Sequence, residues 1–278
     1  EQAANQLMLQ TTGTTRYEGF QDADVVIEAI FEDRDVKREL YQDIEPKMKA
    51  DAVLATNTSS IPLETLAQVL KQPKRLIGLH FFNPVAKMPL LEIVKTGQTP
   101  DSVLEQAGAF SRHIGKLPLP VKSAPGFLVN RILFPYLMEA LDLYAEGISA
   151  EAIDKAALDF GMPMGPVELA DTVGLDICMS VAENLSQSYD FKVPPVLQKL
   201  VNDNKLGKKS GAGFYAYKKG RAVKDRDADL GNQEEIQNRL ILRLLNEAAA
   251  CVREGIVDDS DLLDAGVIFG TGFAPFRG

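Results

Sequence analysis

Two short apolar runs limit the possible folds more than any other feature of the sequence. The first occupies residues 76–82, Leu-Ile-Gly-Leu-His-Phe-Phe, and the second occupies residues 90–94, Leu-Leu-Glu-Ile-Val. Apolar residues follow one another in both runs with little polar alternation, which is typical of strands covered on both faces. A turn-prone connection of about six residues, beginning at Asn83-Pro84, separates the runs. We therefore expect two neighbouring strands in a sheet with apolar cover on both sides.

Each run contains one polar side chain that such surroundings do not explain, His80 in the first and Glu92 in the second. An ionised carboxylate inside an apolar strand is costly unless a donor or a cation meets it. His80 is one of only two histidines and is the nearest candidate. A histidine held by a carboxylate has a fixed tautomer and can serve as a general base. The alternative, in which backbone groups satisfy each side chain separately, fits this stretch equally well.

The residues before these runs alternate between strand and helix patterns. We expect a strand at 24–31, a helix at 34–50, a second strand at 53–56 and another helix opened by Pro62. This alternation predicts a parallel sheet with crossover helices, in which ligands lie at the carboxyl ends of the strands. The predicted apolar face of the 34–50 helix consists of Val36, Leu40, Ile44 and Met48. The strand ends carry Glu32, Asn57, Ser59 and His80.

Residues 57–60, Asn-Thr-Ser-Ser, allow two interpretations. Serine and asparagine commonly cap helices, and a helix is expected directly after this segment. A hydroxyl at the end of one strand and an imidazole on the next strand can also reach one substrate oxygen, as proton transfer to or from an alcohol requires. The sequence thus leaves both a structural and a catalytic role open for Ser59.

The pattern changes after Pro125-Gly126, where helical periodicity replaces the alternation of strands and helices. We expect residues 118–121 to be an extended connector and residues 218–235 to be a linker. Residues 130–147 also align with residues 238–255 at a constant offset, which indicates a duplicated helical unit. The predicted domains are therefore residues 1–123 (α/β), 124–218 (helical) and 219–278 (a linker and a truncated second helical repeat).

Charge and composition exclude several classes of function. The formal net charge is −9, whereas a nucleic acid or an anionic membrane would require a concentrated positive patch. No apolar run approaches the roughly 18 residues that cross a bilayer. Cys178 and Cys251 lack the spacing of metal ligands, so we expect no metal site and two buried free thiols in a reducing compartment. We expect a cytoplasmic protein.

A glycine loop for nucleotide phosphates does not accompany the predicted sheet. The one match to G-x-G-x-x-A, at residues 211–216, follows a basic loop and opens no helix, so we interpret it as a solvated turn. The chain also starts at Glu1 on what reads as the end of a helix over 1–10 and stops at Gly278 after a structured motif. We therefore expect it to be a fragment of a longer protein.

Six motifs follow one another along the chain. They are Asn-Thr-Ser-Ser at 57–60, Gly-Leu-His-Phe-Phe-Asn-Pro at 78–84, Met-Pro-Leu-Leu-Glu at 88–92, Pro-Gly-Phe-Leu-Val-Asn-Arg at 125–131, Pro-Met-Gly-Pro at 163–166 and Gly-Phe-Tyr at 213–215. In order and spacing they resemble the L-3-hydroxyacyl-CoA dehydrogenase family. The repeated helical unit is similar to the second carboxyl-terminal domain of the multifunctional fatty-acid oxidation enzymes.

The resemblance implies a role for each candidate residue. His80 would be the general base and Glu92 its carboxylate partner, Ser59 would bind the substrate oxygen, and Asn130 would meet the acyl portion. The α/β region would be the distal part of a Rossmann-type parallel sheet. The cofactor would be NAD, and the substrate an acyl-CoA in fatty-acid β-oxidation. The positions that match the cofactor side of the family are Glu32, Lys37 and Asn57.

The resemblance also implies partners and a limitation. The protein would form a homo-oligomer or a complex with a thiolase subunit. Because the family's amino-terminal strand, glycine-rich turn and helix are absent here, we expect this chain to bind NAD weakly or not at all. Two other functions fit the architecture: a dehydrogenase acting on free hydroxyacids or sugar acids, and a non-catalytic assembly module built on the duplicated helices.

Overall fold

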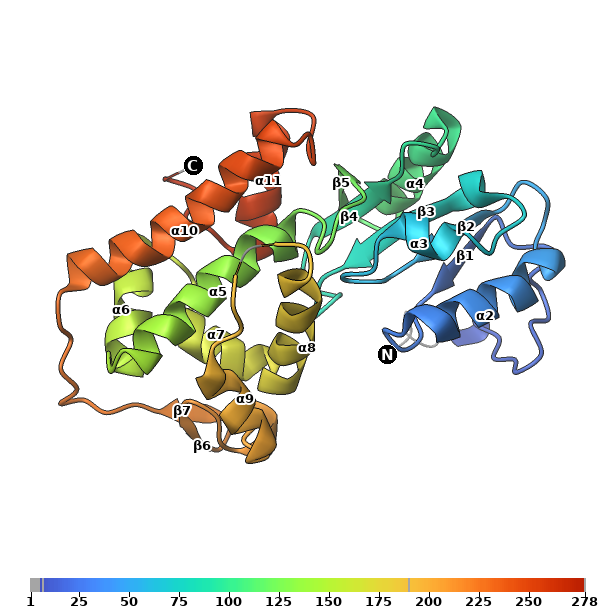
Figure 1. The fold of residues 1–278 in the computed structure, drawn as a ribbon. Coiled ribbons are helices and arrows are strands. Elements are labelled where there is room, and N and C mark those ends of the chain that lie inside the picture. Colours follow the sequence, from blue (N-terminus) through green and yellow to red (C-terminus); the bar gives the residue numbers. More distant parts are fainter. Residues whose placement is uncertain (1–5, 7, 190, 278) are drawn as a thin grey trace.

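A five-stranded sheet with its helices forms one half of the molecule, and a bundle of helices forms the other (Figure 1). The computed structural model describes residues 6, 8–189 and 191–277. Most of the helix expected over residues 1–10 therefore lies outside the described residues. The predicted combination of a Rossmann-like α/β region followed by a helical region is confirmed.

The sheet has the strands in sequential order, β1-β2-β3-β4-β5. Its strands are β1 (Val25–Glu28), β2 (Val53–Thr56), β3 (Leu76–Phe81), β4 (Leu90–Lys95) and β5 (Leu117–Lys122). The first three are parallel, β4 runs antiparallel to β3, and β5 is parallel to β4. The sheet is therefore mixed and not purely parallel, because the connection over residues 82–89 is too short for a crossover helix.

The helices on the sheet half are α2 (Arg34–Ile44), α3 (Leu63–Ala67) and α4 (Asp101–His113), with short 3-10 turns η1 (Glu45–Lys47) and η2 (Pro73–Arg75). The predicted helix over 34–50 ends early because Pro46 has no amide hydrogen to continue the bonding pattern. Its buried face was predicted only in part. Ile44 and Met48 are buried as expected and Leu40 is half-buried, but Val36 is 44% exposed. Lys37 and Tyr41 are buried instead, since a buried carboxylate attracts the lysine inward.

Two strand predictions also need correction. The strand expected over 24–31 ends at Glu28, whose carboxylate accepts a hydrogen bond from the Ile30 amide and so turns the chain out of the sheet. The expected connector over 118–121 is part of β5. Its two prolines are tolerated because β5 pairs on one side only and stands at the edge of the sheet.

The helical half begins with α5 directly after the Pro125-Gly126 break. Its helices are α5 (Val129–Ala145), α6 (Ala150–Phe160), α7 (Pro166–Val173), α8 (Leu175–Ser186), α9 (Pro195–Asn202), the turn η3 (Lys208–Ser210), α10 (Gln233–Arg253) and α11 (Ser260–Thr271). The segment expected to be a linker contains part of a hairpin, β6 (Ala216–Lys218) with β7 (Arg221–Val223).

Asp171 explains why a glycine occupies position 213, within the G-x-G-x-x-A match at residues 211–216. This aspartate is buried in α7 and accepts hydrogen bonds from the backbone amides of Phe214 and Tyr215 at 3.0 and 2.9 Å. A methyl group on Gly213 would lie 2.0 Å from the Asp171 Oδ1 atom, so no larger residue fits there. Asp171 therefore anchors this turn through hydrogen bonds with the turn's backbone.

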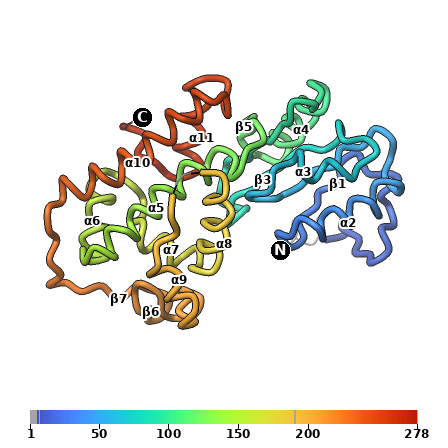
Figure 2. Tube along the Cα trace, in the orientation of Figure 1, coloured from blue at the N-terminus to red at the C-terminus, as the bar shows by residue number. Residues whose placement is uncertain are grey.

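The duplicated unit has reciprocal contacts. Figure 2 shows α10 lying along α5, and the two helices exchange equivalent ion pairs. Arg131 on α5 pairs with Glu247 and Glu254 on α10. Arg239 on α10, 108 residues further along the chain, pairs with Glu139 and Glu146 on α5, which precede Glu247 and Glu254 by the same interval. The two helices are thus related by an approximate twofold symmetry.

Candidate active site

His80 and Glu92 face each other across β3 and β4. The antiparallel register pairs the two residues directly, and Nδ1 of His80 lies 2.6 Å from Oε2 of Glu92. Both side chains are buried, at 4% and 0% exposure. The two apolar runs therefore meet as the sequence predicted.

Backbone groups also hold Glu92, so the alternative interpretation is partly correct. Its second oxygen, Oε1, accepts hydrogen bonds from the backbone amides of Leu128 and Val129 at 3.0 and 2.9 Å. These amides open α5, whose own N-cap residue provides no side-chain cap. Glu92 thus caps a helix of the other half of the molecule, and the positive end of the helix dipole stabilises its charge.

The hydrogen bond to Glu92 determines the tautomer of His80. A carboxylate can only accept, so Nδ1 carries the hydrogen and Nε2 is left with a lone pair. Within residues 6, 8–189 and 191–277, Nε2 has no hydrogen-bond partner. The rings of Phe82 and Phe127 lie edge-on to the imidazole, with centroids 4.6 and 5.6 Å away. The pair is therefore arranged as an oriented base with one free nitrogen.

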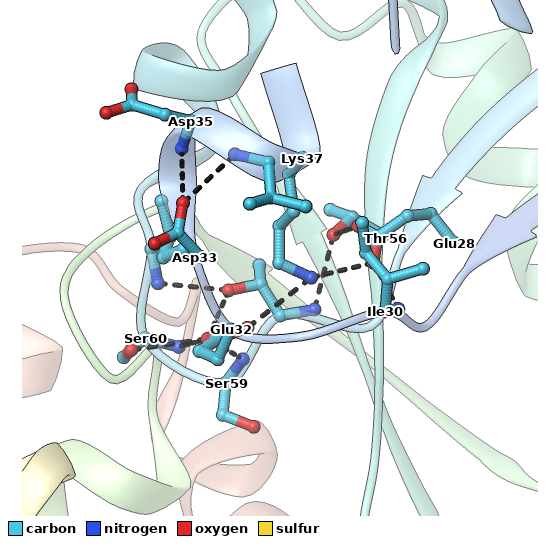
Figure 3. A network of polar contacts seen from close by, with 12 residues as sticks. Glu28, Ile30, Glu32, Asp33, Asp35, Lys37, Thr56, Ser59 and Ser60 are labelled. Atoms are coloured by element: carbon cyan, nitrogen blue, oxygen red, sulfur yellow. Dashed lines mark hydrogen bonds and ion pairs between the residues drawn. The ribbon is translucent and has the colours of Figure 1, made fainter. Parts of the chain in front are cut away.

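Glu32, in the loop between β1 and α2, holds the loop over residues 57–60. Its Oε1 accepts hydrogen bonds from Thr58 Oγ1 at 2.6 Å, the Ser59 amide at 2.8 Å and the Ser60 amide at 3.1 Å (Figure 3). The N-cap residue of α3 is Pro62, without a side-chain hydrogen bond. The interpretation of residues 57–60 as the cap of that helix is therefore wrong. Thr58, Ser59 and Ser60 bond to Glu32, and Thr58 Oγ1 accepts from the amide of Ile61, which precedes the helix.

Hydrogen bonds of Asn57 and Asn130 connect this loop to β3, the strand that carries His80, and to α5. Oδ1 of Asn57 accepts a hydrogen bond from the Phe81 amide, which leaves the Asn57 amide group as a donor. Nδ2 of Asn130 donates to the Ser59 carbonyl at 3.2 Å. Ser59, Asn57, His80 and Asn130 therefore converge, although they come from three separate elements.

Glu28 is a buried acidic residue that our sequence analysis missed. Its carboxylate accepts hydrogen bonds from Lys37 at 2.7 Å, Tyr41 at 2.9 Å and Thr56 at 2.8 Å. Burial raises the pKa of Glu28, but its hydrogen-bond donors, Lys37 first among them, outweigh burial and leave the pKa below its ordinary value. The signal was available, because Glu28, like Glu92, stands in an otherwise apolar run.

Lys37 joins Glu28 to Glu32. Its ammonium group is 1% exposed and lies 3.5 Å from Oε2 of Glu32 in addition to its contact with Glu28 (Figure 3). A cation between two carboxylates cancels charge that would otherwise be buried without compensation. Lys37 therefore supports Glu32 from the interior and does not lie at the surface.

Other site types find no support in the part of the chain that the structure describes. No group of three or more His, Cys, Asp or Glu residues there could hold a metal ion. None of its helices has the length and apolar character needed to cross a membrane. His113 is exposed at the end of α4, and both cysteines are buried and free, as predicted.

Comparison with known proteins shows which family contains this chain. Residues 1–124 match the NAD-binding domain of 3-hydroxyacyl-CoA dehydrogenase, and residues 126–217 match its carboxyl-terminal domain. The crystal structure of (S)-3-hydroxybutyryl-CoA dehydrogenase from Ralstonia eutropha is 37% identical, with a TM-score of 0.75 over 79% of this chain and 80% of that chain. This chain belongs to the 3-hydroxyacyl-CoA dehydrogenase family.

Two further relatives match a larger share of this chain. The 3-hydroxybutyryl-CoA dehydrogenase of Escherichia coli K12 has a TM-score of 0.84 and 27% identity over 95% of this chain and 75% of that chain. The fatty acid oxidation complex subunit alpha of Shewanella baltica is 39% identical over 99% of this chain but only 41% of its own length. The chain thus spans about two fifths of that curated relative.

The residues that follow β1 form a surface that fits a ring of NAD, the cofactor named for the matched domain. Ile30 and Phe31 are 40% and 85% exposed beside Glu32, and such apolar surface suits a flat ring. The free amide of Asn57 and the hydroxyl of Ser59 supply polar groups nearby. A G-x-G-x-x-G loop for the phosphates does not occur in the 278 residues.

Proposed function

We propose that this chain forms the proton-transferring half of an NAD-dependent L-3-hydroxyacyl-CoA dehydrogenase of fatty-acid β-oxidation. The hydrogen bond from His80 Nδ1 to Glu92 carries the proposal, because it leaves Nε2 as a fixed, unoccupied base. An alcohol releases hydride only as it loses its proton, so a base beside the 3-hydroxyl is what this reaction requires. Family membership supports the same reaction.

Each candidate residue has a distinct role in this mechanism. His80 Nε2 takes the proton of the 3-hydroxyl as the C3 hydrogen departs with its electron pair and the carbon–oxygen bond becomes a carbonyl. The hydride acceptor would be supplied by bound NAD. Glu92 holds the Nδ1 hydrogen and stabilises the imidazolium that forms, while the Ser59 hydroxyl binds the substrate oxygen. In the reverse direction His80 returns the proton.

Asn130 and the residues of the Glu32 network orient the reactants. Asn130 lies at the start of α5 and would donate to the acyl portion of the substrate while it holds the Ser59 loop. Glu32 and Asn57 would face the cofactor. Because Lys37 is buried between two carboxylates, we assign it the role of positioning Glu32 and no direct contact with NAD.

The domain boundaries at residues 123 and 218 belong to the same proposal. The α/β domain supplies His80, Glu92 and Ser59, and the helical domain supplies Asn130, so the substrate would bind where the two domains meet. Limited proteolysis tests the division, with cleavage expected in the exposed stretch near residues 224–232 and not inside α5. Cleavage of α5 under native conditions would contradict it.

A fusion protein tests the function directly. Joining the amino-terminal strand, glycine loop and helix of a family member to Glu1 should give NAD-dependent oxidation of (S)-3-hydroxybutyryl-CoA, followed by NADH absorbance. Calorimetry of the unfused chain should detect weak or no NAD binding. Oxidation of the free hydroxyacid but not the acyl-CoA would favour a hydroxyacid dehydrogenase. An inactive fusion with ordinary NAD affinity would favour an assembly module.

The larger assembly is also part of the proposal. The name of the Shewanella baltica relative, fatty acid oxidation complex subunit alpha, supports a complex, and we propose a thiolase subunit as the partner in the cytoplasm. Size-exclusion chromatography after coexpression of the full-length protein with such a subunit tests this. Separate elution of both proteins at micromolar concentration would contradict it, and self-association in the same experiment would indicate a homo-oligomer.

A further inference from the structure

The second helical unit, defined as α10 and α11, holds the first turn of α5 through Arg131. This side chain is only 4% exposed, and its guanidinium forms two hydrogen bonds to Glu254, at 2.6 and 2.9 Å, with Glu247 at 3.4 Å. The ring of Tyr189 lies 4.4 Å from the guanidinium carbon. Arg131 follows the residues whose amides hold Glu92, so this ion pair fixes α10 to the same turn.

Two glycines let α11 approach this turn from another side. A methyl group on Gly270 would lie 2.5 Å from Cγ2 of Val129 and 3.1 Å from Cδ2 of Leu90. A methyl group on Gly266 would lie 2.6 Å from Cδ2 of Leu128. The helix therefore packs directly on Leu128 and Val129, the two residues that donate their amides to Glu92.

We propose that the second helical unit is a positioning element for the His80–Glu92 pair, acting through the first turn of α5, with Arg131 as its main contact. Among the described residues, no hydrogen bond or ion pair joins the unit to His80 or Glu92, but the unit contacts the backbone that orients the carboxylate. Displacing a supporting group by about 1 Å can reduce catalysis about 10²-fold. The catalytic meaning of this inference depends on the proposed function, whereas its structural content does not.

The approximate symmetry of α5 and α10 supplies a matched control. Arg239 makes the same kind of ion pairs as Arg131, but at the opposite end of the helix pair, far from Glu92. The carboxylates left behind would be similarly exposed: 22% and 45% for the partners of Arg131, and 21% and 51% for those of Arg239. Arg131→Met and Arg239→Met thus remove ion pairs of the same kind, of which only the first touches the first turn of α5. Arg131 is the more buried of the two, at 4% against 34% exposure, so the comparison is made after correction for the stability of each variant.

Amide hydrogen exchange in the 278-residue chain tests the inference without cofactor or substrate. After correction for the global stability of each variant, Leu128 and Val129 should exchange about tenfold faster in Arg131→Met than in Arg239→Met. The low-field proton resonance of the His80 Nδ1 hydrogen bond should shift or broaden only in Arg131→Met. The spectrum of the His113→Gln variant assigns this resonance, because His80 is then the one histidine left in the chain. Equal exchange in both variants would overturn the proposal.

A second pair of variants keeps the test decisive if Arg131→Met does not fold. Gly270→Ala should push α11 away from Val129 and speed its exchange, whereas Gly108→Ala in α4 meets nothing closer than an arginine side chain at 3.4 Å and should not. Unchanged protection in Gly270→Ala would overturn the proposal.

In the active fusion protein, Arg131→Met should lower kcat with little change in KM, and Arg131→Lys should restore part of the lost kcat. An inactive fusion would refute the function and leave the exchange result valid.

Discussion

His80 and Glu92 stand opposite each other on antiparallel strands, with Nδ1 of the imidazole 2.6 Å from Oε2 of the carboxylate. The other carboxylate oxygen receives two amides at the start of α5. One buried side chain therefore orients the base and joins the α/β and helical halves. Substitutions in this region should affect both catalysis and the packing of α5.

Replacing His80 with glutamine should abolish most of the proposed activity. Without a base, kcat of the fusion protein should fall by about 10²–10⁴-fold, while the affinity for acyl-CoA changes little. His113→Gln is the control, because that residue is exposed at the end of α4. Steady-state kinetics of both variants check the prediction, and an active His80→Gln protein would rule out the proposed base.

Glu92→Gln should destabilise the protein as well as impair it. The amide has one acceptor oxygen where the carboxylate has two. Either a buried donor loses its partner, or His80 changes tautomer, accepts from the glutamine NH2 group and loses the lone pair on Nε2. The expected cost is about 1–3 kcal/mol in the free energy of unfolding, measured by urea denaturation. Glu105→Gln on the exposed face of α4 should cost little. Equal stability of the two variants would show that Glu92 does not support α5.

Lys37→Met should be more harmful alone than together with Glu28→Gln. The single change leaves a carboxylate with 0% exposure without its cation, at a cost of about 3–5 kcal/mol. Removing the charge of both partners avoids that penalty. A double-mutant cycle by chemical denaturation measures the coupling. Additive effects of the two substitutions would contradict a direct interaction in the folded protein.

Asp154 should make stability fall as the pH rises through the weakly acidic range. Burial raises the pKa of Asp154 from 3.8 to about 6, although the hydrogen bond that the Tyr215 hydroxyl donates to this carboxylate lowers the pKa. The folded protein thus binds more protons than the unfolded chain between these values. The stabilisation is complete below about pH 4 and is lost as the pH rises through about 6, for a total of up to about 3 kcal/mol.

The Asp154→Asn variant isolates this effect, since asparagine does not titrate. Relative to the variant, the wild-type protein should lose unfolding free energy between about pH 4 and pH 7, measured by denaturation at several pH values. Parallel pH dependence of the two proteins would exclude Asp154 as the source.

Much of the α/β half was predictable from local patterns. Apolar runs identified β2, β3 and β4, and the two polar residues within them identified the His80–Glu92 pair. The errors arose where a distant group decided the outcome. Lys37 turned inward because Glu28 is buried beside it, and residues 57–60 bond to Glu32 instead of capping α3. Glu28 itself was missed although it carried the same signal as Glu92.

The sequence alone determined which residues are chemically unusual, because a histidine or a carboxylate within a buried strand requires a partner. It also determined the duplication, since the repeat is visible as a constant offset. Only the tertiary structure decided what those partners are. The amides of Leu128 and Val129 meet Glu92, and Arg131 meets Glu254, through contacts between elements distant in the chain. Local periodicity carries no information about such contacts, because they depend on how whole elements pack.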